Sequence, residues 1–129
     1  MIKEDFVTFL RGKVMLVGIG NPLRGDDGLG PALIQMLQGH VRALCLDVGT
    51  TPESYIGKII KEKPDTIVLV DAVHLGAAPG RYAVLEKDEI AQAGFSTHDC
   101  SPKILLQYLE SQVPSNIYLL GVQPGTLAM

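Results

Sequence analysis

The sequence predicts an α/β protein in three layers, α/β/α, with a mostly parallel, twisted five-stranded sheet and helices on both faces. Three observations predict this class. Short apolar runs alternate with segments of helical periodicity, Gly and Pro fall regularly between them, and no internal repeat breaks the order. The length of 129 residues is that of one domain, so we assign residues 1–129 to a single unit.

Five apolar runs are expected to form the strands. Residues 14–19 (VMLVGI) are almost continuously apolar, as in a parallel strand that is buried on both faces. Residues 66–73 (TIVLVDAV) are the run richest in β-branched residues and are expected to be the central strand. Residues 81–85 follow a Pro-Gly turn and are expected at an edge. The full set is 14–19, 41–48, 66–73, 81–85 and 116–122.

Three segments between these strands carry apolar residues at helical spacing, and residues 87–93 fit a further short helix. The three longer helices are expected at residues 31–38, 52–63 and 102–113. The apolar positions are Ala32, Leu33, Met36 and Leu37 in the first, Tyr55, Ile56, Ile59 and Ile60 in the second, and, facing inward, Ile104, Leu105, Tyr108 and Leu109 in the third. Because only seven residues follow the last strand, we expect the C-terminal helix of such a fold to be absent from this chain.

Composition and charge exclude several classes of partner. Hydrophobic residues make up 47% of the chain, which is enough for a core, and 11 basic against 14 acidic residues give a net charge of −3. There is no basic block that would follow nucleic-acid phosphates. There is also no apolar leader and no run long enough to cross a bilayer, so we expect a cytoplasmic protein without a nucleic-acid or membrane partner. The two cysteines form no CxxC motif and are expected to be thiols.

Polar residues gather where the predicted strands end. In an open α/β sheet the ligand binds beyond the carboxyl ends of the strands. The candidates at these ends are Asp26, Asp27, Asp47, Asp71, His74 and Gln123, with His98 and Cys100 in the loop before the third long helix. Residues 18–23 (GIGNPL) lack the third glycine of a dinucleotide-binding motif, and two acids follow them, so nucleotide binding is disfavoured.

Two carboxylates and one imidazole from separate loops would form an O,O,N site with open positions, which suits Zn, Ni, Mn or Fe. Spacing alone does not choose the ion, nor does it choose between His74 and His98. One of the paired acids can instead cap the first helix, and Asp47 is placed much like Asp71. Cys100 with His98 offers a weaker alternative, a cysteine nucleophile, whereas a serine triad lacks its GxSxG motif.

Four segments together resemble a known family. They are residues 18–31 (GIGNPLRGDDGLGP), 71–73 (DAV), 96–98 (STH) and 120–124 (LGVQP). The chain resembles the nickel-dependent maturation endopeptidases of [NiFe] hydrogenases, and within them most closely the branch that serves formate-hydrogenlyase and energy-converting hydrogenases. The resemblance implies an α/β/α peptidase that removes the C-terminal extension of the hydrogenase large-subunit precursor after nickel insertion.

The resemblance also implies which residues carry the function. The family's metal-contacting and catalytic positions fall on Asp27, Asp71 and His98, so His74 and Asp47 become bystanders, with a structural role left to Asp26. Nickel would be the cofactor, delivered by the substrate, and other divalent ions such as Zn or Cd can take its place in vitro. Water activated either by the metal or by a carboxylate would attack the peptide bond.

Two alternatives to this reading stay open. One is a general metallopeptidase that holds its own metal, and the other is a non-catalytic protein that binds the precursor in a nickel-dependent way.

Delivery of nickel by the substrate is consistent with the ligand set. Three moderate ligands need not hold an ion permanently, because the precursor can complete the coordination through its own cysteines.

Overall fold

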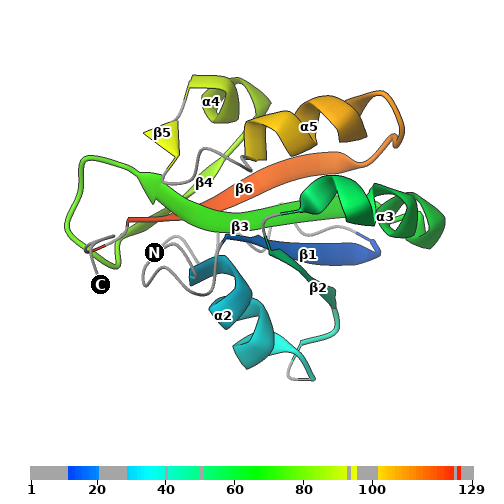
Figure 1. Ribbon diagram of the computed structural model, residues 1–129, viewed down its shortest axis with the longest axis horizontal. Coiled ribbons are helices and arrows are strands. Elements are labelled where there is room, and N and C mark those ends of the chain that lie inside the picture. Colours follow the sequence, from blue (N-terminus) through cyan, green and yellow to red (C-terminus); the bar gives the residue numbers. More distant parts are fainter. Residues whose placement is uncertain are drawn as a thin grey trace.

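Figure 1 shows the computed structural model of the chain, in which helices lie on both faces of a central sheet. The structure describes residues 12–20, 29–39, 41–49, 51–92, 94–95, 102–123 and 125. In chain order its elements are β1 (Val14–Ile19), α2 (Leu29–Leu37), β2 (Leu44–Gly49), the 3-10 helix η2 (Pro52–Tyr55), α3 (Ile56–Glu62), β3 (Thr66–His74), β4 (Tyr82–Leu85), α4 (Lys87–Gln92), β5 (Gly94–Phe95), α5 (Pro102–Glu110) and β6 (Asn116–Val122).

The sheet has β3 at its centre, as predicted. Its strand order is β2-β1-β3-β6-β4, and β2, β1, β3 and β6 run parallel to one another. The last strand in this order, β4, runs antiparallel to β6 and forms one edge, which confirms the predicted edge strand. The additional two-residue strand β5 pairs with the end of β3. It was not predicted, because two residues carry no periodicity.

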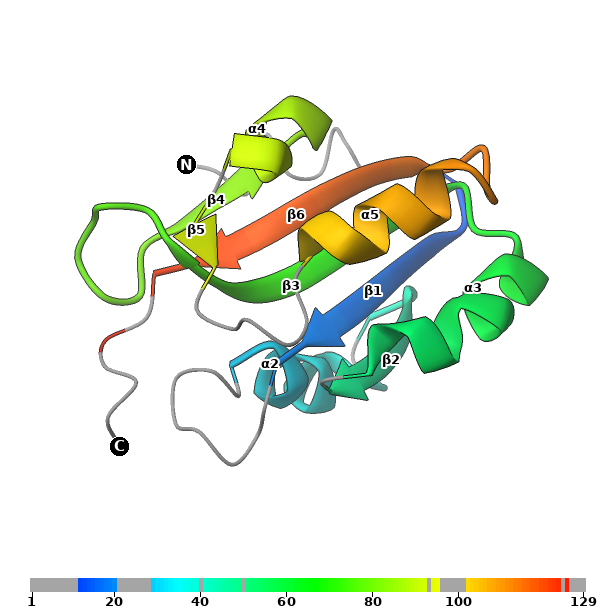
Figure 2. The ribbon, with the colours of Figure 1, turned by 45° about the horizontal axis from the view of Figure 1, so that its top comes forward.

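Helices cover both faces of the sheet, which confirms the three layers (Figures 1 and 2). On one face, Ile34 of α2 packs with Val70 of β3 in a small apolar cluster. On the other face, α3, α4 and α5 contribute Ile59, Ile90 and Leu109 to a larger core, and all three side chains are fully buried. Apolar residues of β3 alternate between these two clusters, as expected for a strand that is covered on both sides.

The predicted inner face of α5 is partly wrong. Leu105 and Leu109 are buried, but Ile104 and Tyr108 are 44% and 54% exposed. The helix buries Leu105, Leu106 and Leu109, and Val113, just past its end, continues the stripe of Leu105 and Leu109 at four-residue steps. Ile104 and Tyr108 precede this stripe by one position, a rotation of about 100° around the helix, and so they reach the solvent.

The first helix also differs from its prediction. It begins at Leu29, and its inner face is centred on Ile34, whereas Ala32 is exposed and Met36 is 70% exposed. The second strand begins at Leu44, three residues later than predicted. In the described part of the chain no helix is long and apolar enough to cross a membrane. Nor does a helix follow β6 there, where the description ends at Gly125.

Candidate active site

The carboxyl ends of β1 and β3 lie where the chain changes direction across the sheet. From β1 the chain passes through α2 to β2 on one side, and it then returns through α3 to β3 on the other side. The helices α2 and α3 lie on opposite faces (Figure 2). In open parallel sheets such a switch point forms the crevice that holds the ligand. The topology therefore places the candidate site at this edge.

Asp71 lies at the carboxyl end of β3, beside this switch point. It follows Val70, the last residue of β3 to pair with β1 through Gly18, and it lies opposite Gly121 of β6. Its side chain is fully buried, and its Oδ1 accepts a hydrogen bond of 2.8 Å from the backbone N–H of Ala72. Burying a carboxylate is costly unless hydrogen bonds or a cation stabilise its charge. A carboxylate can act as a metal ligand or a proton acceptor, and this role of Asp71 stays a prediction.

Two glycines allow α2 to approach the carboxyl ends of β1 and β3 more closely than side chains would permit. A Cβ atom on Gly30 would lie 2.6 Å from the carbonyl oxygen of Val70 and 2.8 Å from the backbone nitrogen of Ile19. A Cβ atom on Gly18 would lie 2.7 Å from the carbonyl oxygen of Gly30. At each of these three distances the added Cβ atom would overlap a backbone atom. The first turn of α2 therefore rests directly on the backbone beside Asp71, which explains why glycine occupies both positions.

The short strand β5 brings another part of the chain to β3. Phe95 of β5 pairs with Val73 in an antiparallel arrangement, two residues beyond Asp71. Residues 94–95, between α4 and α5, are thus attached to the carboxyl end of the central strand. This contact joins residues that are 22 positions apart in the sequence.

Asp27 and His98, the other two predicted ligands, lie outside the described residues, and their role stays a prediction. Their near neighbours in the chain are described. Asp27 precedes Gly30 by three residues, and His98 follows Phe95 by three residues. Gly30 lies against Val70, and Phe95 pairs with Val73, so both described neighbours contact β3 within two residues of Asp71. No group of three metal-binding side chains occurs among the described residues. Of the three predicted ligands, these residues include Asp71 alone.

Asp47 and His74, the predicted bystanders, lie at the ends of β2 and β3. The Oδ1 atom of Asp47, at the end of β2, accepts a hydrogen bond of 2.9 Å from the backbone N–H of Gly49. This local bond gives the half-buried carboxylate a structural function. His74 is the last residue of β3 and pairs through its backbone with Gly94. Asp26 lies outside the described residues.

Cys45 lies in β2 and has no feature of an activated nucleophile. The residue is half-buried, and its Sγ is 3.8 Å from the carbonyl oxygen of Ala43. Burial raises the pKa of the Cys45 thiol above its ordinary value, which favours the unreactive protonated form. Cys100, the alternative nucleophile near His98 in the sequence, lies outside the described residues.

Gln123 forms contacts that the sequence did not reveal. It directly follows β6, and its side-chain Oε1 accepts a hydrogen bond of 2.6 Å from the backbone N–H of Leu75. Its backbone oxygen accepts a bond of 2.9 Å from the N–H of Gly80, and its N–H donates a bond of 2.7 Å to the oxygen of Arg81. In the sequence, Gln123 stands out only by its position after a predicted strand, because its partner Leu75 is 48 residues away.

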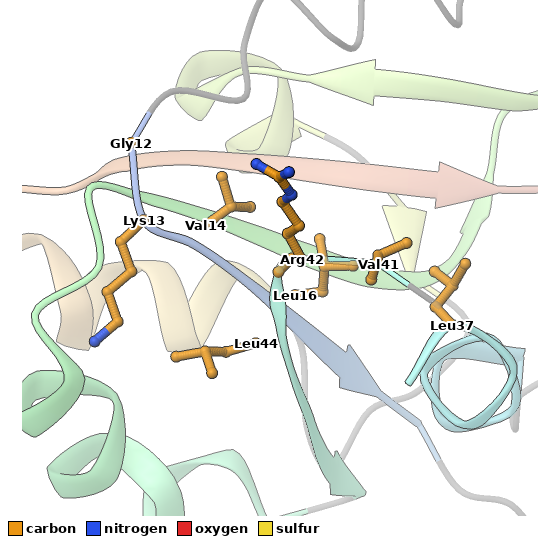
Figure 3. A pocket seen from close by; sticks show the side chains of 9 residues that line it. Gly12, Lys13, Val14, Leu16, Leu37, Val41, Arg42 and Leu44 are labelled. Carbon is orange, nitrogen blue, oxygen red and sulfur yellow. The ribbon is translucent and has the colours of Figure 1, made fainter. Parts of the chain in front are cut away.

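A hollow of about 510 Å³ lies at the opposite end of β1, beside β2 (Figure 3). Leu16, Leu37 and Val41 gather there, and the side chain of Arg42 lies next to them. Its described lining contains no carboxylate, imidazole or thiol. Its chemistry is therefore not that of the predicted metal site, which we place at the carboxyl ends of the strands.

Fold and site together define an open-sheet α/β protein with a buried acid at its topological switch point. Comparison with known proteins identifies the family. The model of the family HycI, hydrogenase maturation protease, matches residues 32–129. A putative hydrogenase maturation protease of Methanocaldococcus jannaschii is 30% identical, over 95% of this chain and 80% of the relative. The hydrogenase 3 maturation protease of Escherichia coli is 31% identical, over 85% of this chain and 72% of the relative.

A solved structure agrees with these relatives. The crystal structure of the [NiFe] hydrogenase maturation protease HycI from Thermococcus kodakarensis superposes with a TM-score of 0.83 at 36% identity, covering 100% of this chain and 84% of that protein. The chain therefore belongs to the hydrogenase maturation protease family, and it is a peptidase. This confirms the family that the four sequence segments suggested.

Proposed function

We propose that this peptidase removes the C-terminal extension of a [NiFe] hydrogenase large-subunit precursor once the precursor has received its nickel. Membership of the family supports the class of reaction. The observation that carries the proposal is the position of Asp71, a fully buried acid in the central strand at the switch point of the sheet. Gly30, three residues after Asp27, and Phe95, three residues before His98, both lie against β3 close to Asp71.

Asp27, Asp71 and His98 would together offer the nickel two carboxylate oxygens and one imidazole nitrogen. Such a set binds a divalent transition ion without closing its coordination sphere, so an ion that arrives with the precursor can keep ligands from the precursor. Nickel would supply Lewis acidity at the scissile peptide. The role of the peptidase itself is to position that peptide and to accept a proton from the attacking water at a carboxylate.

The requirement for nickel follows from this division of ligands. Without nickel, the precursor lacks the group that links it to Asp71 and its partners, so it binds in no fixed orientation. With nickel, binding and orientation occur together. The metal would then act as the signal that insertion is complete, and cleavage would follow only at that stage.

The test compares two aspartates that differ in position. Asp71→Asn keeps an oxygen that can accept the Ala72 N–H but removes the charge, and Asp47→Asn makes the same change at a carboxylate that serves Gly49. We expect Asp71→Asn to slow processing of nickel-loaded precursor by about 100-fold or more, and Asp47→Asn to change it by less than about twofold. Thermal unfolding checks that both variants are folded. Near-normal processing by a folded Asp71→Asn variant would contradict the proposed role.

A further inference from the structure

Gln123 holds both ends of the loop that leaves the central strand. This loop, residues 75–81, joins β3 to β4. The Gln123 side chain accepts the N–H of Leu75 at the start of the loop, while its backbone bonds to Gly80 and Arg81 at the end. A single residue of β6's carboxyl end thus closes the loop at three points.

Few of the described hydrogen bonds lie within the loop itself. Gly76 and Gly80 have φ angles of +68° and +90°, and residues 76–80 (GAAPG) are exposed. Ala78 accepts the N–H of Arg81 at 3.1 Å, so Pro79 and Gly80 occupy the central positions of a type II turn. The turn orders the second half. In the first half, the partly buried side chain of Leu75 packs against the larger core, and its N–H is bound by the Gln123 side chain.

The position of the loop relates it to the candidate site. It begins four residues after Asp71 and projects beyond the carboxyl end of β3, at the end of the sheet where β1 leads into α2 (Figures 1 and 2). Between its glycines it presents only two alanines and a proline. Such a surface can contact an extended peptide through main-chain groups and small apolar side chains, and the exposed Arg81 at the end of the loop adds one positive charge.

We infer that Gln123 is a positioning residue for the precursor: it fixes the 75–81 loop beyond the carboxyl end of β3, the strand that carries Asp71, as a surface against which the peptide to be cleaved is aligned. The inference rests on the proposed function. Gln123 acts through the Leu75 N–H and not on the reacting atoms. Its loss therefore lowers the fraction of molecules with a binding-competent loop, which weakens precursor binding and leaves the chemical step largely intact.

The side chain can be altered without removing the other anchors. Gln123→Met keeps the length of the side chain but removes the acceptor, and Gln123→Glu restores an oxygen acceptor. The backbone bonds to Gly80 and Arg81 remain in both variants. Gln112→Met is the matched control, because Gln112 is exposed in the turn after α5, at the amino end of β6.

Two measurements test the inference. For nickel-loaded precursor we expect Gln123→Met to raise KM by about tenfold with kcat within about threefold of wild type, while Gln123→Glu and Gln112→Met keep KM within about twofold. Hydrogen exchange of the Leu75 N–H should accelerate about tenfold or more in Gln123→Met alone. An unchanged KM in Gln123→Met, or a raised KM with unaltered exchange at Leu75, would overturn the inference. A wild type that cleaves no precursor overturns the proposed function instead, and exchange at Leu75 still decides whether Gln123 holds the loop.

Discussion

Gly30 rests on the carbonyl oxygen of Val70 so closely that no Cβ atom fits between them. A Cβ on this glycine would overlap backbone atoms of two strands, β1 and β3, and backbone cannot move aside as a side chain can. This contact places the first turn of α2 one residue from Asp71. The glycine at this position therefore has a geometric function, which links the motif in the sequence to the layout of the candidate site.

Replacing Gly30 by alanine should destabilise the protein. We expect Gly30→Ala to lower the free energy of unfolding by about 1 to 3 kcal/mol, because the added methyl group forces α2 away from the sheet. Gly57→Ala is the matched control. Gly57 lies in α3 with nothing within 4 Å of its would-be Cβ, so this change should be neutral or stabilise by about 0.5 to 1 kcal/mol. Urea unfolding measures both, and equal stabilities of the two variants would contradict the tight contact.

Much of the fold could be predicted because its signals are local. The β-branched run that contains Asp71 marks a strand buried on both faces, and that pattern alone is enough to place it at the centre of the sheet. The Pro79-Gly80 turn separates this strand from the edge strand that follows. Once a parallel sheet is inferred, the rule for carboxyl ends leads to a short set of candidates that includes both Asp71 and Asp47. The resemblance to the family, and not the rule, singles out Asp71.

The parts that could not be predicted depend on contacts between distant residues. Apolar residues at 104, 105, 106, 108 and 109 surround much of α5, so spacing could not tell which stripe meets the sheet. Val113, just past the helix, is buried in line with Leu105 and Leu109, so this stripe faces the sheet, and Ile104 and Tyr108 are exposed. Likewise, the bond from Gln123 to Leu75 and the pairing of Phe95 with Val73 exist only after the strands are assembled.

Cys45 should behave as a structural thiol. Because burial raises its pKa, the thiolate fraction near pH 8 is smaller than in a free cysteine, and alkylation should be correspondingly slower. The reaction rate should then rise with pH along a curve displaced to higher pH. A Cys100→Ser background leaves Cys45 as the single thiol for this measurement, with the urea-unfolded chain as the reference. Alkylation at the same rate in folded and unfolded protein would show that burial does not protect it.

Removal of metal from the peptidase should not abolish processing. If nickel arrives with the precursor, protein treated with EDTA and then freed of the chelator should cleave nickel-loaded precursor at a rate within about twofold of untreated protein. Metal analysis of the treated protein and a precursor cleavage assay provide the comparison. Loss of activity that returns when an ion is added back to the peptidase alone would instead indicate a metallopeptidase with its own metal.

The most direct test of the account is the intact mass of a large-subunit precursor after incubation with this protein, with nickel-loaded and nickel-free precursor compared side by side. We predict that the loaded form alone loses one C-terminal peptide, because only nickel links the precursor to Asp71 and the two residues predicted to act with it. Cleavage of both forms would contradict the requirement for nickel. Cleavage of neither, with binding of the loaded form retained, would contradict a catalytic role and leave a nickel-dependent binding protein.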